Sequence, residues 1–171
     1  VPTSPAIPDL SAVLGYPMTG LGTQIGKFKH GYGTPFPFRL LSYPGMSPVT
    51  LKAQLEKLKI PGLSYQLKSY RLPDRHTGMG VYVIVDDYSV LRPTQLSFEM
   101  MKLAAKWDSP NPFASATDAQ MVLYNKHVGS TEWWNAISTQ GSRIDLTYFL
   151  RKFELESDTF QEFSQRYWIY Q

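Results

Sequence analysis

The sequence predicts an α/β (α+β) fold in which a small mixed β-sheet carries helices packed on it and the C-terminal third is helical. The first observation is a β-branched run at residues 81–87, where Val81, Val83 and Val85 share one face and Tyr82 and Ile84 share the other. A strand that is apolar on both faces belongs in the middle of a sheet. The second is an amphipathic helix that follows at Pro93, and the third is helical periodicity beyond residue 117.

The N-terminal segments precede the first clear strand. Pro2, Pro5 and Pro8 predict an extended arm over residues 1–11 of a single domain spanning 1–171. Residues 10–16 form a short apolar segment that fits a first helical turn or a strand. Five glycines within residues 18–33 predict a loop, and the prolines before Leu40 predict that the next strand lies at an edge of the sheet.

The next segments carry clear signals for a helix and a strand. Ser47 followed by Pro48 is typical of a helix start, with Leu51, Leu55 and Leu58 as its core stripe. Residues 63–68 alternate apolar and polar side chains, which predicts a strand with one solvated face. A polar loop at residues 70–79 connects that strand to the central one.

The helices after the central strand are predicted from apolar spacing. The helix beginning at Pro93 has its core stripe at Leu96, Met100, Leu103, Ala104 and Trp107. Four further helices are expected at residues 117–126, 130–138, 145–153 and 157–167. We expect Ser157 to cap the last one, with an aromatic stripe of Phe160, Phe163 and Tyr167 docked on the sheet. The paired tryptophans at 133 and 134 are interpreted as core residues.

Composition excludes several kinds of protein. The chain has no cysteine, which excludes disulfides, thiol catalysis and thiolate metal sites. His30, His76 and His127 show no metal-ligand spacing, and no nucleotide or nucleophile motif is present, so we expect no metal and no cofactor. No apolar stretch approaches the length of a membrane helix, so no membrane partner is expected. The compartment is not fixed by the sequence, although secretion is the favoured expectation.

Three clusters of polar residues are candidate sites. The first, Tyr70, Arg71, Asp74, Arg75 and His76, combines anion-binding guanidiniums with groups that transfer protons, or is a solvated loop whose charges pair with each other. The second, Lys29, His30, Tyr32, Gly33 and Thr34, offers backbone N–H groups and lysine for a ligand, or is a structural turn. The third is Asp86, Asp87 and Arg92 at the C-terminal end of the central strand, as part of a site or with Asp87 and Arg92 as a local ion pair that caps the next helix.

Several separated patches, in a shared order, resemble one protein family. Residues 8–17 (PDLSAVLGYP), 31–38 (GYGTPFPF) and 58–62 (LKIPG) are similar to motifs of the C-terminal domain of bacterial exo-β-N-acetylmuramidases, which are cell-wall glycoside hydrolases. So are Gly80-Val81 through Leu91-Arg92-Pro93, and the closing Phe160, Phe163, Arg166 and Tyr167–Tyr170. The resemblance implies the fold of that domain and a glycan partner.

The same comparison of motifs shows departures. In the family, a Rossmann-like N-terminal domain precedes this one and carries much of the catalytic apparatus; the 171 residues do not include it. The family's E-G-T is Leu21-Gly22-Thr23 here, so its carboxylate is lost, and the arginine of G-R-G-T is Tyr32. The scaffold therefore carries over more firmly than the muramidase activity.

These observations leave three hypotheses. The first is a stand-alone glycoside-directed protein that binds glycan or cell-wall fragments. The second, suggested by a net charge of +3, a pI of about 9.0 and 14% aromatic residues, is a basic RNA-directed toxin. It would be an rRNA N-glycosidase that inactivates ribosomes or a ribonuclease. The third is one half of an enzyme whose catalytic partner chain is encoded separately. Whether the chain is an enzyme stays open, and an enzyme would be a glycosidase.

Overall fold

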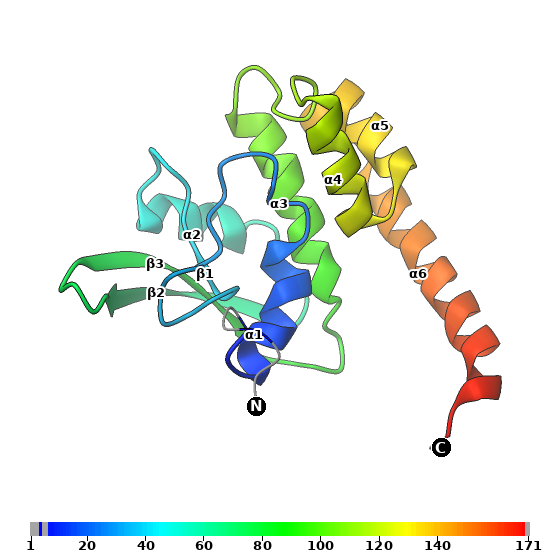
Figure 1. Ribbon diagram of the computed structural model, residues 1–171, viewed down its shortest axis with the longest axis horizontal. Helices are drawn as coiled ribbons and strands as arrows, with labels where there is room; N and C mark the ends of the chain where they lie inside the picture. Colours follow the sequence, from blue (N-terminus) through cyan, green and yellow to red (C-terminus); the bar gives the residue numbers. More distant parts are fainter. Residues whose placement is uncertain (1–3, 5–6, 170–171) are drawn as a thin grey trace.

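A computed structural model describes residue 4 and residues 7–169. The β-sheet lies on one side of the helix Pro93–Trp107, and the C-terminal helices lie on its other side (Figure 1). The predicted α/β class is confirmed. The helices are α1 (Leu10–Gly15), α2 (Pro48–Glu56), α3 (Pro93–Trp107), α4 (Asp118–Val128), α5 (Thr131–Gln140) and α6 (Leu146–Ser164); the strands are β1 (Leu40–Leu41), β2 (Leu63–Arg71) and β3 (Thr77–Val85). A π-helical turn (Tyr16–Gly20) follows α1, and 3₁₀ turns lie at Gly141–Arg143 and Gln165–Tyr167.

The sheet has the strand order β1-β3-β2, so the run at 81–85 lies in the central strand as predicted. Both pairings are antiparallel, with Tyr65 opposite Val83 in the β2–β3 pair, so the prediction of a mixed sheet was wrong in strand direction. Val81 and Val83 are fully buried. Tyr82 on the other face is only half-buried, because the Phe36 ring and the Lys68 ammonium cover it instead of a helix.

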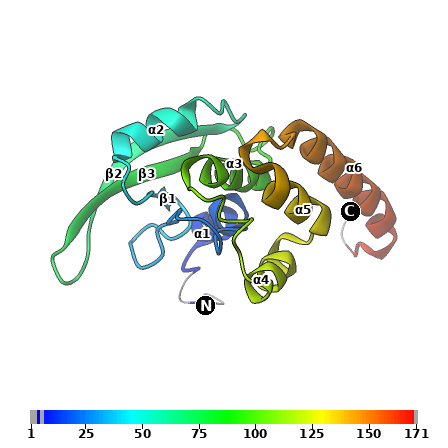
Figure 2. The ribbon, with the colours of Figure 1, turned by 90° about the horizontal axis from the view of Figure 1, so that it is seen from above.

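One face of the sheet is covered by α2 (Figure 2). The Ser47 side chain accepts a hydrogen bond from the Thr50 backbone N–H at 3.1 Å, and Pro48 takes the first helical position, as predicted. Leu51 and Leu55 are buried, since their side chains fall on the face that meets β2 and β3. The predicted edge strand β1 is present but is only two residues long.

Helix α3 joins the two parts of the molecule because it is buried on more than one side. The predicted Leu96, Met100 and Ala104 are buried, and so are Phe98 and Met101 on neighbouring turns. These last two side chains face the C-terminal helices, where Phe98 meets the Trp133 ring at 4.7 Å between centroids. A single stripe predicted from spacing therefore understates how much of α3 lies in the core.

The C-terminal helices enclose a polar network within an aromatic core. Trp133 Nε1 donates to the Tyr124 hydroxyl at 2.8 Å, and that hydroxyl donates to Met101 Sδ at 2.7 Å. Both polar groups are fully buried, so each needs such a partner. Trp133 and Trp134 are core residues, as the sequence predicted.

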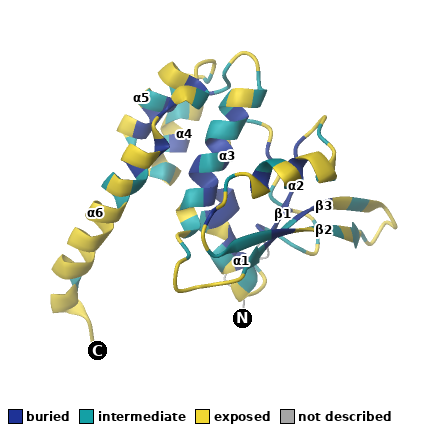
Figure 3. Cartoon of the chain, turned by 180° about the vertical axis from the view of Figure 1, so that it is seen from behind, coloured by how far each residue is buried: buried dark blue, intermediate teal, exposed yellow. Residues whose placement is uncertain are grey.

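The most visible difference from the prediction is α6, which is one continuous helix where two were expected (Figure 3). No helix-breaking residue separates residues 153 and 157, so Ser157 lies inside the helix and Asp145 is the N-cap. The side chains of Phe160, Phe163 and Tyr167 are 68%, 52% and 66% exposed. The predicted aromatic stripe is therefore present, but it does not dock on the sheet.

Two predicted segments, the loop at 70–79 and the arm at 1–11, also differ in their boundaries. The expected loop at 70–79 is mostly strand, because β2 continues through Arg71 and β3 begins at Thr77, so that only residues 72–76 form the turn of a hairpin. The predicted arm at 1–11 is shortened by α1, which begins at Leu10; residues 1–3 and 5–6 of that arm lie outside the described residues.

None of the described helices combines the length and apolar character needed to cross a membrane.

Candidate functional site

A pocket of about 220 Å³ lies between the glycine-rich loop and the part of the β2–β3 hairpin next to its turn. We call it the loop pocket. It joins residues of two clusters that the sequence placed far apart, since Tyr70 meets Lys29, Tyr32 and Thr34 there. Its other lining residues are Gly31, Leu40, Ser42, Met79 and Gly80.

The glycine loop is held in place by backbone contacts. Lys29 and Ser42 exchange backbone hydrogen bonds of 2.9 and 3.0 Å, which fixes the loop to the end of β1. Gly31 has φ +81°, and a Cβ there would lie 2.3 Å from the Phe36 carbonyl oxygen, so only glycine fits. Thr34 closes the turn by donating from Oγ1 to the Gly31 carbonyl at 2.7 Å.

Tyr70 reaches the pocket because its partner across the hairpin is a glycine. In the β2–β3 register Tyr70 lies opposite Gly78, and a Cβ on Gly78 would lie 2.5 Å from the tyrosine hydroxyl. Tyr32, from the other wall, is 72% exposed. The pocket therefore offers two tyrosine side chains and a lysine, which suit a ligand with many hydroxyl groups, while the Thr34 hydroxyl is engaged within the turn by Gly31 and Phe36.

Two predicted members of the second cluster do not line this pocket. His30 stacks flat on Phe38, with 4.8 Å between ring centroids and 5° between planes. Its burial lowers the pKa of the imidazole, so the ring is neutral at pH 7 and serves packing. Gly33, with φ +79°, only supplies the turn, because a Cβ there would meet nothing within 4 Å.

The rest of the first cluster lies at the tip of the hairpin. The Asp74 carboxylate accepts from the His76 backbone N–H at 3.1 Å and lies 3.0 Å from His76 Nδ1, with both side chains exposed. Arg75 sits between them with φ +69°, and Arg71 is exposed at the end of β2. Asp74 and His76 therefore contact each other within an exposed turn, while Arg71 and Arg75 form no ion pair with another described residue.

Asp87 and Arg92 lie at the opposite end of β3. The nine residues of β3 separate them from the hairpin tip by roughly 30 Å at about 3.4 Å per residue. Asp87 accepts from the Ser89 backbone N–H at 2.8 Å and from its hydroxyl at 2.6 Å, which lowers the pKa of that carboxyl. Arg92 pairs with Glu154 of α6. The third cluster therefore does not join the first.

A larger pocket that sequence reasoning missed lies between α3, the α4–α5 turn and α6. Its volume is about 420 Å³, and we call it the interhelical pocket. Its lining residues are Leu21, Thr94, Phe98, Val128, Gly129, Ser130, Thr131, Glu132, Lys152, Phe153 and Glu156. They come from segments far apart in the chain, so no local motif could have indicated the pocket; the one local signal was Ser130, which caps α5.

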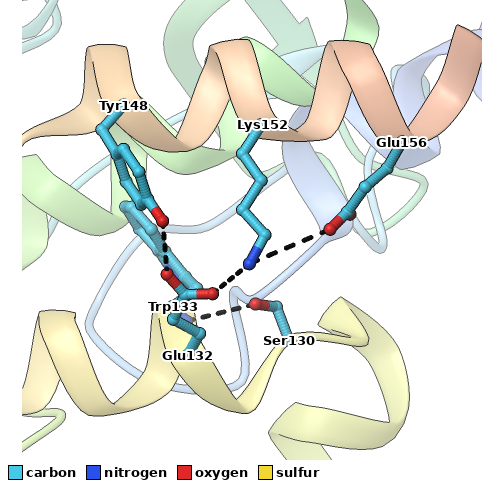
Figure 4. Close-up of polar contacts among 6 residues, drawn as sticks. All are labelled: Ser130, Glu132, Trp133, Tyr148, Lys152 and Glu156. Carbon is cyan, nitrogen blue, oxygen red and sulfur yellow. Dashed lines mark hydrogen bonds and ion pairs between the residues drawn. The ribbon is translucent and has the colours of Figure 1, made fainter.

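A chain of charged and hydroxyl groups borders the interhelical pocket (Figure 4). The Glu132 carboxylate accepts from the Tyr148 hydroxyl at 3.0 Å and from Lys152, both on α6. The Lys152 ammonium contact and the tyrosine hydroxyl hold the pKa of Glu132 below its usual value, so it stays ionised. Among the described residues, this pocket included, no three His, Asp or Glu side chains gather as a metal site would require.

Comparisons with known proteins agree with this architecture. Residues 14–170 match the family model for the C-terminal part of the exo-beta-N-acetylmuramidase NamZ. A peptidoglycan beta-N-acetylmuramidase NamZ of Bacillus subtilis is 30% identical over 105 residues, which cover 58% of this chain and 25% of that protein. A crystal structure of a DUF1343 family protein from Bacteroides fragilis superposes with a TM-score of 0.79 at 22% identity, covering 100% of this chain and 45% of the other. The chain thus spans less than half the length of either protein.

Proposed function

This chain belongs to the family of C-terminal domains of exo-beta-N-acetylmuramidases, and from that membership we propose that it binds cell-wall glycan in the loop pocket. The observation that carries the proposal is the meeting of Tyr70 with Lys29, Tyr32 and Thr34. Two stretches chosen as binding candidates for their residue types line one cavity, and a relative is named for its action on peptidoglycan.

The chemistry of the loop pocket suits a cell-wall sugar. Tyrosine rings pack against the apolar faces of sugar rings, while hydroxyls bind the sugar hydroxyls. Lys29 adds a positive charge, and N-acetylmuramic acid carries a carboxylate that an ammonium group attracts. The pocket therefore favours an acidic sugar over a neutral one.

The proposal concerns binding and does not extend to glycoside cleavage. The matched relatives carry more than half of their length outside the region shared with this chain. Leu21, at the position of the family's E-G-T glutamate, brings no carboxylate. Neither the pockets nor the comparisons support an RNA-directed activity, and we do not carry that hypothesis further.

Isothermal titration calorimetry with N-acetylmuramic acid and with the disaccharide of N-acetylglucosamine and N-acetylmuramic acid tests the proposal. We expect saturable binding, weakened about tenfold in Tyr32→Ala, which is about 1.4 kcal/mol. Tyr88→Ala is the matched control because Tyr88 is exposed and does not line the loop pocket. Absence of binding to both sugars, or equal loss in both variants, would overturn the proposal.

A further inference from the structure

The interhelical pocket has an excess of negative charge that its own residues do not neutralise. Its titratable lining groups are Glu132, Lys152 and Glu156, which give two negative charges against one positive charge. The Lys152 ammonium donates a hydrogen bond to the Glu132 carboxylate, which also accepts a hydrogen bond from the Tyr148 hydroxyl. The Glu156 carboxylate forms only a long ion pair with the same Lys152 nitrogen, at 3.9 Å, which is beyond hydrogen-bond distance.

The geometry in Figure 4 shows why Glu156 is the group available to a ligand. Glu132 projects from α5, and Lys152 and Glu156 project from successive turns of α6 toward the same space. The Glu132–Lys152 ion pair is sufficient to link α5 to α6. Glu156 adds a second carboxylate to the pocket without adding a short contact between the helices.

The remaining lining groups define the body of the ligand. The hydroxyls of Thr94, Ser130 and Thr131 border the pocket, and the rings of Phe98 and Phe153 form an apolar part of its wall. A volume of about 420 Å³ lies within the range of roughly 300–1,000 Å³ for small-molecule sites. Such a site accommodates a ligand of one sugar ring or one amino-acid side chain.

We propose that the interhelical pocket binds a small polar ligand through a protonated primary amine. The Glu156 carboxylate, beside Lys152, accepts the hydrogen bonds of this amine. A free amino sugar and a lysine-like side chain both carry this group. The site is separate from the loop pocket, since the two share no lining residue. It therefore does not depend on the proposed glycan binding.

Calorimetry with three probes tests the amine. Glucosamine carries the ammonium group, N-acetylglucosamine has the same ring without the charge, and Nα-acetyl-lysine amide has the charge without the ring. We expect glucosamine or the lysine derivative to bind at least fivefold more tightly than N-acetylglucosamine. The tighter of the two identifies the source of the amine. Equal affinity for glucosamine and N-acetylglucosamine, with no binding of the lysine derivative, would overturn the proposal.

Variants locate the binding. Glu156→Gln removes one charge from the pocket and is expected to weaken amine binding at least fivefold. Glu162→Gln is the matched control, because it removes the same charge from the same helix outside the pocket lining. Tyr32→Ala in the loop pocket should leave amine binding unchanged, so failure of one proposal is distinguishable from failure of the other. Equal losses in Glu156→Gln and Glu162→Gln would show a general charge effect and overturn the assignment.

Discussion

The two halves of α6 share one helical geometry and opposite surroundings. In the first half, Leu146 and Phe149 are buried, and the Phe149 ring meets Trp133 edge-on at 5.1 Å. In the second half, Leu155, Phe160 and Phe163 are exposed, and the helix extends away from the body (Figure 1). Apolar spacing therefore predicts that a segment is helical and amphipathic, but it does not tell what covers the apolar face.

The largest expected contrast comes from truncating one aromatic ring in each half. Phe149→Ala should lower the free energy of unfolding by about 3–5 kcal/mol, because it leaves a cavity in the core. Phe160→Ala should change it by less than about 0.5 kcal/mol, since the ring is exposed. Urea denaturation measures both values. Similar losses in the two variants would show that the second half is packed against the body after all.

A second test concerns the network under the first half. Tyr124→Phe removes the hydroxyl that accepts from Trp133 Nε1, leaving a buried N–H group without that partner. We expect a loss of about 1–2 kcal/mol in the free energy of unfolding by urea titration. A loss as small as that of Phe160→Ala would indicate that Met101 Sδ, 3.3 Å from Trp133 Nε1, suffices as acceptor.

Helix caps give a third, smaller contrast. Asp145 accepts from the Tyr148 backbone N–H at 3.2 Å, so Asp145→Ala should lower the free energy of unfolding by about 1 kcal/mol. Ser157→Ala should be neutral or slightly stabilising, because Ser157 lies inside the helix and alanine has the higher helix propensity. Thermal unfolding followed by circular dichroism measures the two. A larger loss for Ser157→Ala would restore the two-helix prediction.

The smallest effect is expected from the pH dependence of the Glu132–Lys152 ion pair, which links α5 to α6. The pKa of Glu132 is lowered in the folded protein by Lys152 and Tyr148. Its contribution to stability is therefore present above the pKa of the unfolded chain and is lost as the pH falls through the lowered folded pKa. Glu132→Gln should remove part of this acid sensitivity, as measured by urea midpoints between pH 7 and pH 3. An unchanged pH profile would mean that the exposed contacts contribute nothing measurable.

Much of the fold follows from the sequence because its signals are local. The Ser47–Pro48 helix start, the doubly apolar strand at 81–85 and the helix after Pro93 depend on neighbouring residues. The continuity of α6 was missed because serine followed by an aromatic stripe is typical of a helix start. The same residues are equally compatible with the middle of an exposed helix.

The candidate site was predictable in its residue types but not in its grouping. Tyr70 was assigned to the charged turn, yet it lines the loop pocket together with Tyr32, and Asp74 and His76 do not. Asp87 and Arg92 form a separate candidate cluster, and the nine residues of β3 keep it away from that turn. The interhelical pocket depends on the packing of three helices, which no spacing in the chain encodes.

Gly78 shows how a residue with no side chain can shape the loop pocket. The tyrosine ring at 70 occupies the space that any larger residue at 78 would fill. Replacing this glycine with alanine would swing the ring outward and remodel the cavity from a position that touches no ligand. When homologous chains are compared, a glycine at this position is therefore as informative about the shape of the cavity as the aromatic side chain that lies on it.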